Sequence, residues 1–133
     1  MKNTIESIVQ GHQEAFQKTF GPGQYELLDK MAHAIIQALK TGNKVLLCGN
    51  GGSASDSLHI AAEFVGRFEK NRRSLPAIAL TADIAALTAI GNDFGFEKVF
   101  SRQIEGLGKK GDILILLSTS GRSPNILDAI TQA

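Results

Sequence analysis

The sequence has little of several residue types whose abundance marks particular protein classes. Tryptophan is absent, tyrosine and cysteine occur once each, and proline occurs three times in 133 residues. The single cysteine, Cys48, excludes an internal disulfide, and its place at the end of an apolar run predicts a buried, reduced thiol. A chain without disulfides favours a cytoplasmic location.

Long apolar runs and an excess of one charge are also missing. The run at 113–117 is far shorter than the roughly 20 residues of a membrane helix, so no membrane association is expected. No apolar segment follows Lys2, so no signal peptide is expected either. With a net charge of +1, the chain lacks the basic footprint of a nucleic-acid-binding protein, and no nucleic-acid partner is expected.

The first 42 residues show helical periodicity. Apolar residues recur at helical spacing in two segments separated by Gly21-Pro22-Gly23, which ends the first of them. We expect residues 1–42 to form a leading helical hairpin within the same domain as the rest. These amphipathic helices carry more apolar surface than a solvated arm needs, so we expect them to pack on another subunit of a homo-oligomer.

Residues 43–133 alternate between apolar runs and helical patterns. Strands are expected at 44–48, 77–80 and 112–117, and helices at 53–67, at 84–90 before a turn at 91–95, at 97–107 and from Pro124 onward. This alternation predicts an α/β fold with a parallel sheet. The run at 112–117 has no polar alternation, which is typical of a strand buried on both faces. The polar segment at 69–74 is expected to be a loop in which Arg72 and Arg73 are solvated.

Two polar loops follow expected strands, where parallel sheets bind ligands. The glycine loop (49–53) has glycines that allow a ligand to approach the backbone, and the helix after it offers N–H groups to an anion. The alternative is a tight turn with Ser53 as helix N-cap. The serine loop (118–123) carries hydroxyls and a glycine that suit phosphate oxygens. Its alternative is a solvated turn with local side-chain-to-backbone bonds.

A third group lies on the helix after the glycine loop. His59 and Glu63 share one face at i, i+4, with Asp56 one turn earlier. The pair suits two metal ligands or an acid–base pair, and the alternative is a structural or exposed pair. Arg67 either neutralises the helix C-terminus or reaches a phosphate. Asn92 and Asp93, between glycines, indicate chiefly a turn.

Taken together and in this order, these motifs resemble those of the phosphoheptose isomerases, members of the sugar isomerase (SIS) domain superfamily. The matching segments, from about Lys44 to the end, are Cys48-Gly-Asn-Gly-Gly-Ser53, His59 with Glu63, Gly66-Arg67, Pro76-Ala-Ile, Gly91-Asn-Asp-Phe-Gly95 and Ser118-Thr-Ser-Gly-x-Ser123. The resemblance implies a three-layer SIS sandwich, a homotetramer, and isomerisation of sedoheptulose 7-phosphate to glycero-manno-heptose 7-phosphate, a precursor of the heptose of lipopolysaccharide.

The resemblance also implies roles for individual residues. The phosphate would be held by Ser118, Thr119, Ser120 and Ser123. The sugar and phosphate site would be lined by Asn50, Gly51, Gly52 and Ser53. Asn92 and Asp93 would contact the substrate chain from this or a neighbouring subunit, and Arg67 would lie close by. Glu63 would be the general base, and His59 with Glu63 would bind zinc in the members that carry it.

The resemblance has one departure and leaves two alternatives. The family continues past Ala133 with a strand, a loop and a helix that carry a glutamine and a histidine of the metal and acid–base set, so a 133-residue form is expected to bind sugar phosphate and isomerise it poorly. One alternative is a non-catalytic SIS protein of the type that binds a replication initiator, which tends to lack the glutamate at position 63. The other is a sugar-phosphate-sensing domain, which normally accompanies a DNA-binding domain.

Overall fold

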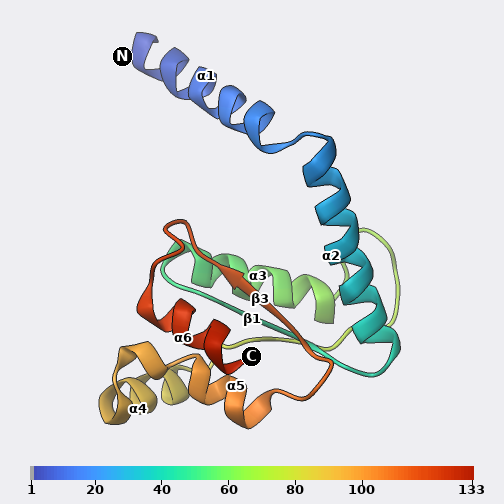
Figure 1. The fold of residues 1–133 in the computed structure, drawn as a ribbon, viewed down its shortest axis with the longest axis vertical. Coiled ribbons are helices and arrows are strands. Elements are labelled where there is room, and N and C mark those ends of the chain that lie inside the picture. The colour runs from blue at the N-terminus through green and yellow to red at the C-terminus, as the bar shows by residue number, and fades with distance from the viewer. Residues whose placement is uncertain (1) are drawn as a thin grey trace. The chain divides into compact units, whose positions relative to one another are not determined.

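The computed structural model describes residues 2–133, with side chains from Thr4 onward, and divides into two compact units that meet between residues 36 and 37 (Figure 1). Helix α1 spans Lys2–Thr19 and α2 spans Pro22–Lys40. The large apolar residues of both helices are exposed over most of this stretch, among them Ile8, Phe16 and Met31. The apolar faces that the sequence predicted are therefore uncovered in the single chain, and the predicted boundary at 42/43 stays a prediction.

A three-stranded parallel sheet lies at the centre of the second unit. Strands β1 (Val45–Gly49), β2 (Ala77–Ala79) and β3 (Ile113–Leu117) are arranged in the order β2-β1-β3. This arrangement confirms the expected α/β class. Every residue of β1 is buried, whereas every residue of β3 is only partly buried. The expectation that 112–117 is covered on both faces is confirmed in part, because Leu114 and Leu116 pack on the core and α3 contacts β3 from the other face, but none of its residues is fully buried.

Helices cover both faces of this sheet. Helix α3 (Gly52–Val65) packs on the strands from one side. On the other side Leu46 and Cys48 of β1 form a core with Phe100, Ile104 and Ile126. These partners come from the segment between a 3₁₀ turn (η1, Phe96–Lys98) and α5 (Ser101–Leu107), from α5 itself, and from α6 (Pro124–Gln132), which Figure 1 shows below the sheet. Alternate residues of a strand face opposite sides, so β1 serves both layers of the expected sandwich.

Helix α4 (Ile84–Phe94) is longer than the sequence indicated. Its N-cap is Asp83, whose carboxylate accepts a hydrogen bond from the backbone N–H of Ala86 at 2.9 Å. It runs through the expected turn at 91–94 and ends at Gly95, which has a φ of 91°. That backbone conformation favours glycine, so Gly95 rather than Gly91 ends the helix. The expected helix at 97–107 is divided into η1 and α5.

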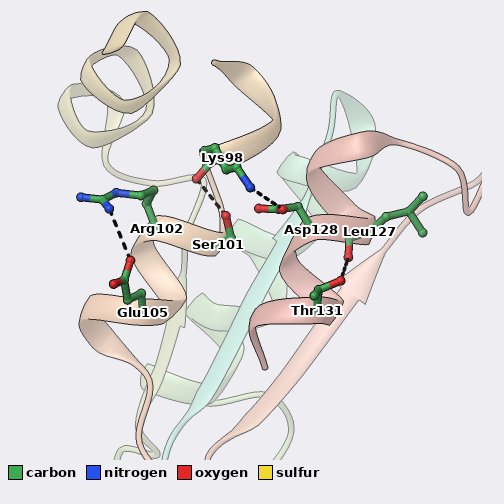
Figure 2. A network of polar contacts seen from close by, with 7 residues as sticks. All are labelled: Lys98, Ser101, Arg102, Glu105, Leu127, Asp128 and Thr131. Carbon is green, nitrogen blue, oxygen red and sulfur yellow. Dashed lines mark hydrogen bonds and ion pairs between the residues drawn. The ribbon is translucent and has the colours of Figure 1, made fainter. Parts of the chain in front are cut away.

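Polar contacts tie the last helix to the segment before α5 (Figure 2). The Lys98 ammonium lies 2.7 Å from Oδ1 of Asp128, which joins η1 to α6. This hydrogen bond holds the pKa of Asp128 below its ordinary value. Arg102 and Glu105 form a second, more exposed pair along α5. The ion pair with Lys98 holds α6 beside the segments on which its apolar residues pack.

A second ion pair joins the starts of β1 and β3. Asp112 accepts hydrogen bonds from the backbone N–H of Lys44 at 2.9 Å and of Lys109 at 2.8 Å, and its carboxylate also pairs with the Lys44 ammonium. Burial acts to raise the pKa of Asp112, but these hydrogen bonds hold it below its ordinary value. The pair fixes the register in which Val45 lies beside Ile113. Among the helices described, none is long and apolar enough to cross a membrane.

Candidate functional site

The glycine loop and the serine loop lie at the same edge of the sheet. β1 and β3 are parallel neighbours, and Gly49 at the end of β1 pairs with Leu117 at the end of β3. The residues that follow, Asn50 and Ser118, therefore leave the sheet side by side. Because the two polar loops meet where parallel sheets bind ligands, one anion can be held between them.

The glycine loop leads directly into α3. Gly51 has a φ of 57° and is the N-cap of α3, without a side-chain cap. Ser53 lies inside the helix, so the alternative in which it is the N-cap is wrong. The Ser57 hydroxyl donates to the carbonyl of Ser53 at 2.8 Å. The first turn of α3 is thus left without a capping side chain, which suits an anion at the helix N-terminus.

Gly49 makes the closest backbone approach in this loop. A Cβ built on it would lie 2.6 Å from the carbonyl oxygen of Ser53 and 2.7 Å from its Cβ. We expect Gly49→Ala to displace the first turn of α3, lowering the free energy of unfolding by about 1–3 kcal/mol. Because that turn belongs to the expected anion site, sugar-phosphate binding should weaken as well. Denaturant unfolding would measure the change in stability, and calorimetry the change in binding.

Gly106→Ala provides the matched control for this substitution. A Cβ on Gly106, which lies within α5, would meet nothing within 4 Å. It should therefore leave stability unchanged or raise it by up to about 1 kcal/mol. Equal stability and binding in the Gly49→Ala and Gly106→Ala variants would show that the close approach at Gly49 has no consequence.

The serine loop is exposed and bonded to itself in part. Ser118 Oγ accepts from the N–H of Gly121 at 3.0 Å, and Ser120 Oγ accepts from the N–H of Arg122 at 3.2 Å. Such local bonds are those expected if the loop is only a solvated turn. A hydroxyl that accepts a hydrogen bond can still donate its own hydrogen to a ligand. Ser123 is the N-cap of α6 but makes no side-chain capping bond. The loop therefore offers hydroxyl donors next to a helix N-terminus.

One residue that the sequence did not single out joins the two loops. Asn125 in α6 is 2% exposed, and its side-chain amide exchanges two hydrogen bonds with that of Asn50, at 2.9 and 2.8 Å. Both residues line a pocket of about 300 Å³ together with Phe96, Glu97, Ser123 and Pro124. No sequence signal marks this pair, because its members lie 75 residues apart.

His59 and Glu63 lie together on α3 but away from the loops. Nε2 of His59 is 3.5 Å from Oε1 of Glu63, and the side chains are 77% and 33% exposed. They border a largely apolar pocket of about 410 Å³ that also includes Phe64, Phe68 and Leu75. Glu63 lies about 15 Å along the helix axis from Ser53, at about 1.5 Å per residue. Within one chain, His59 lies near the middle of α3 and Glu63 near the end away from the two loops.

The donor set of this pair fits part of a zinc site. Imidazole nitrogen and carboxylate oxygen are both zinc ligands, and two ligands of a tetrahedral zinc lie about 3.3 Å apart, close to the separation of this pair. Among the described residues no group of three or more His, Cys, Asp or Glu side chains is placed to hold a metal. His59 and Glu63 can thus supply two ligands, and further ligands would have to come from elsewhere.

The end of α3 is held by an arginine for which the sequence predicted a solvated loop position. The guanidinium of Arg72 donates to the carbonyls of Glu63 at 2.7 Å and Phe64 at 2.9 Å. It thereby satisfies carbonyls that the helix leaves unpaired at its C-terminus. The prediction for Arg72 was wrong because the loop folds back onto the helix. Arg67, by contrast, is exposed beyond the end of α3.

The remaining candidates do not line the pocket between the loops. Asn92 and Asp93 are exposed in the last turn of α4 and bond to each other, with Nδ2 2.8 Å from Oδ1. Phe96 and Glu97, just after them, line that pocket instead. Cys48 is fully buried, and burial raises the pKa of its thiol to about 12. The prediction of a buried thiol is confirmed, and such a thiol is not a nucleophile at neutral pH.

Comparison with known proteins gives these motifs a family. The family model described as the SIS domain matches residues 12–133, so the likeness begins well before Lys44, where the motifs begin. The phosphoheptose isomerase of Nitratiruptor sp. is 55% identical over 133 residues, covering 100% of this chain and 71% of that protein. That of Clostridium acetobutylicum is 53% identical over 134 residues, covering 100% and 68%.

Solved structures agree with the sequence relatives. The phosphoheptose isomerase of Francisella tularensis superposes with a TM-score of 0.91 at 39% identity, covering 98% of this chain and 68% of that one. That of Neisseria gonorrhoeae gives a TM-score of 0.82 at 42% identity, covering 99% and 66%. The chain thus spans about two thirds of the length of these relatives. It belongs to the SIS domain family and, within it, to the phosphoheptose isomerases.

Proposed function

We propose that this chain acts in the isomerisation of sedoheptulose 7-phosphate to D-glycero-D-manno-heptose 7-phosphate, a reaction that supplies heptose for lipopolysaccharide. The observation that carries the proposal is the juxtaposition of the two loops. Gly49 and Leu117 are register partners, and the amides of Asn50 and Asn125 join the segments that follow them. Loops of this composition on adjacent parallel strands suit a phosphorylated sugar.

The serine loop is assigned to the phosphate. Ser118, Thr119, Ser120 and Ser123 supply hydroxyl donors, and the N-terminus of α3 supplies the favourable end of a helix dipole. No lysine is needed, because neutral donors can surround a phosphate. Binding at the phosphate, remote from the reacting carbons, provides energy to position C1 and C2 of the substrate.

The reacting carbons are assigned to the His59–Glu63 pair. The Glu63 carboxylate removes the proton from C1 of the ketose, giving an enediol, and returns it to C2, while the hydroxyl proton of O1 is lost and O2 gains one. His59, whose Nε2 lies 3.5 Å from Oε1 of Glu63, is assigned to transfer the proton that O1 loses and O2 gains. Zinc held by His59, Glu63 and further ligands would supply polarisation of the substrate carbonyl.

Assembly brings these parts together in this proposal. Because Glu63 lies near the end of α3 away from the loops, we assign the complete site to a homotetramer in which neighbouring subunits contribute. The exposed apolar residues of α1 and α2, including Ile8, Phe16 and Met31, support association. In such an assembly, Asn92, Asp93 and Arg67 would also contact the substrate. The buried thiol of Cys48 is consistent with a cytoplasmic enzyme.

The alternative of a non-catalytic, initiator-binding protein has less support. Proteins of that type tend to lack the glutamate, whereas here Glu63 is present and lies 3.5 Å from His59. The relatives described above are named for the isomerase.

Binding by the 133-residue chain tests the proposal directly. Calorimetry should show saturable binding of sedoheptulose 7-phosphate and none of sedoheptulose at the same concentration. Ser120→Ala should weaken that binding about 10- to 150-fold, the value of one hydrogen bond to a charged group at about 1.5–3 kcal/mol. Ser74→Ala, which removes an exposed hydroxyl from the loop after α3, should leave it unchanged.

Equal binding of the phosphorylated and unphosphorylated sugars would contradict the assignment of the serine loop. So would a Ser120→Ala variant that binds as tightly as the unsubstituted chain.

A further inference from the structure

The amide pair of Asn50 and Asn125 is a partly buried polar contact between the glycine loop and the start of α6. Asn125 is 2% exposed and lies in the first turn of α6, two residues after Ser123. A buried amide must be hydrogen-bonded to avoid a desolvation cost of about 1–3 kcal/mol. Asn50 supplies both partners that Asn125 has for its side-chain oxygen and for one of its side-chain hydrogens.

The pairing couples the orientation of the Asn50 amide to that of Asn125. A side-chain amide can rotate by half a turn and exchange its donor and acceptor ends, but rotating either amide of this pair alone would place oxygen against oxygen and N–H against N–H. Here Nδ2 of Asn50 donates to Asn125 at 2.9 Å and Oδ1 of Asn50 accepts at 2.8 Å. One N–H and one lone pair of Asn50 stay available for a ligand, in directions that Asn125 determines.

The same pairing holds the two loops together. Asn50 is followed by Gly51 and Gly52, which have no side chains to anchor the loop. Asn125 belongs to the helix that begins directly after the serine loop. A hydrogen-bonded pair between them keeps the two loops at one separation before any ligand binds, which lowers the ordering cost of binding.

We propose that Asn125 is a positioning residue that orients Asn50 and holds the glycine loop against the serine loop for sugar-phosphate binding. This inference rests on the proposed function, because it assigns a purpose to the loops as a phosphate site. Asn125 itself does not have to touch the ligand.

Asn125→Asp provides a test with a pH signature. The carboxylate keeps an acceptor for Nδ2 of Asn50 but faces Oδ1 of Asn50 without a hydrogen, whereas the protonated acid has the hydrogen and restores both bonds. At pH 7.5 we expect the dissociation constant for sedoheptulose 7-phosphate to rise about tenfold, equivalent to about 1.4 kcal/mol. By pH 4.5 the ratio to the unsubstituted chain should fall below about threefold, because burial raises the pKa of such a carboxyl above about 3.9.

The ratio of the two dissociation constants reports on the substituted position, because other titrating groups affect both proteins alike. Glu97 is the titratable side chain that lines the pocket of the pair, Arg122 lies in the serine loop, and the ion pair of Lys98 with Asp128 joins η1 to α6. All of these are present in both proteins, as are the titrating oxygens of the substrate phosphate. Asn71→Asp, which adds the same charge at an exposed loop position, should bind like the unsubstituted chain at both pH values.

A second readout does not depend on the ligand. Amide hydrogen exchange at 50–53 should be faster in Asn125→Asp than in the unsubstituted chain at pH 7.5, and the same change should appear in Asn50→Asp, which places the carboxylate on the other side of the pair. Exchange there should be unaffected by Asn71→Asp. If Asn125→Asp does not fold, Asn50→Asp carries this part of the test.

The outcomes separate this inference from the function on which it rests. If the unsubstituted chain does not bind sugar phosphate, the proposed function fails, and faster exchange in the variant then establishes only the coupling of the loops. If the unsubstituted chain binds but Asn125→Asp binds equally well at pH 7.5, the inference is overturned. Weakening that does not recover at pH 4.5 would also overturn it, since it would reflect general damage.

Discussion

Replacing Glu63 by glutamine is expected to lower the rate of enediol formation from sedoheptulose 7-phosphate by about 10²–10⁴-fold, the usual contribution of a general base. The amide of glutamine matches the carboxylate in size but cannot take the C1 proton. Binding should change by less than about threefold, because the phosphate is assigned to loops at the other end of α3. Incorporation of deuterium from solvent at C1 of the substrate, followed by NMR with and without added zinc, measures the step.

Glu69→Gln is the control for this substitution. It makes the same chemical change at an exposed position in the loop after α3 and should leave exchange at C1 unaffected. Exchange that persists in Glu63→Gln would remove Glu63 from the role of base. Saturable binding without exchange in the unsubstituted chain would confine the function of these 133 residues to the binding step.

Asp112→Ala is expected to lower the free energy of unfolding by about 3–5 kcal/mol, more than Gly49→Ala. The substitution leaves the Lys44 ammonium, only 17% exposed, without its partner and removes the acceptor of the N–H groups of Lys44 and Lys109. Because the free energy of unfolding of an ordinary domain is only about 5–15 kcal/mol, this is a large part of the total. Urea unfolding at pH 7 measures the difference.

The pH dependence identifies the cause of that loss. A carboxyl whose pKa is lowered by folding stabilises the protein above its unfolded pKa of about 3.9, and this contribution disappears as the pH falls through the folded value. The gap between Asp112→Ala and the unsubstituted chain should therefore narrow below about pH 4. Glu105→Ala, which removes a more exposed partner of Arg102, should cost less than about 1 kcal/mol at either pH. A gap under 1 kcal/mol at pH 7, or one unchanged in acid, would show that the ion pair contributes little.

Most of the architecture was predictable because its signals are local. The run at 44–48 and the glycines after it indicate a strand followed by a turn and a helix wherever they occur, and the structure confirms them as β1 and α3. The error at 91–94 had a local cause too. Asn and Asp between glycines favour a turn, but the apolar residues Leu87 and Ile90 pack on the core and keep the segment helical to Gly95.

The candidate site was predictable only in part. That both loops lie at one edge of the sheet follows from the parallel sheet that the alternation of strands and helices predicts, but that β1 and β3 are neighbours is a finding of the structure. The close approach of Gly49 to Ser53, the capping of α3 by Arg72 and the pairing of Asn50 with Asn125 were not foreseen. Each depends on the distance between particular side chains, to which hydrophobic periodicity is insensitive.

The sequence by itself determined the α/β class, the position of the polar loops after the strands, the i, i+4 pair of His59 and Glu63, and the family resemblance. These properties depend on the order of residues and on preferences that act over a few positions. Only the tertiary structure decided that β1 rather than β3 is the central strand and that Asn125 supports Asn50. Such relations arise when segments far apart in the chain pack together, because the partners are then chosen by the geometry of the whole fold.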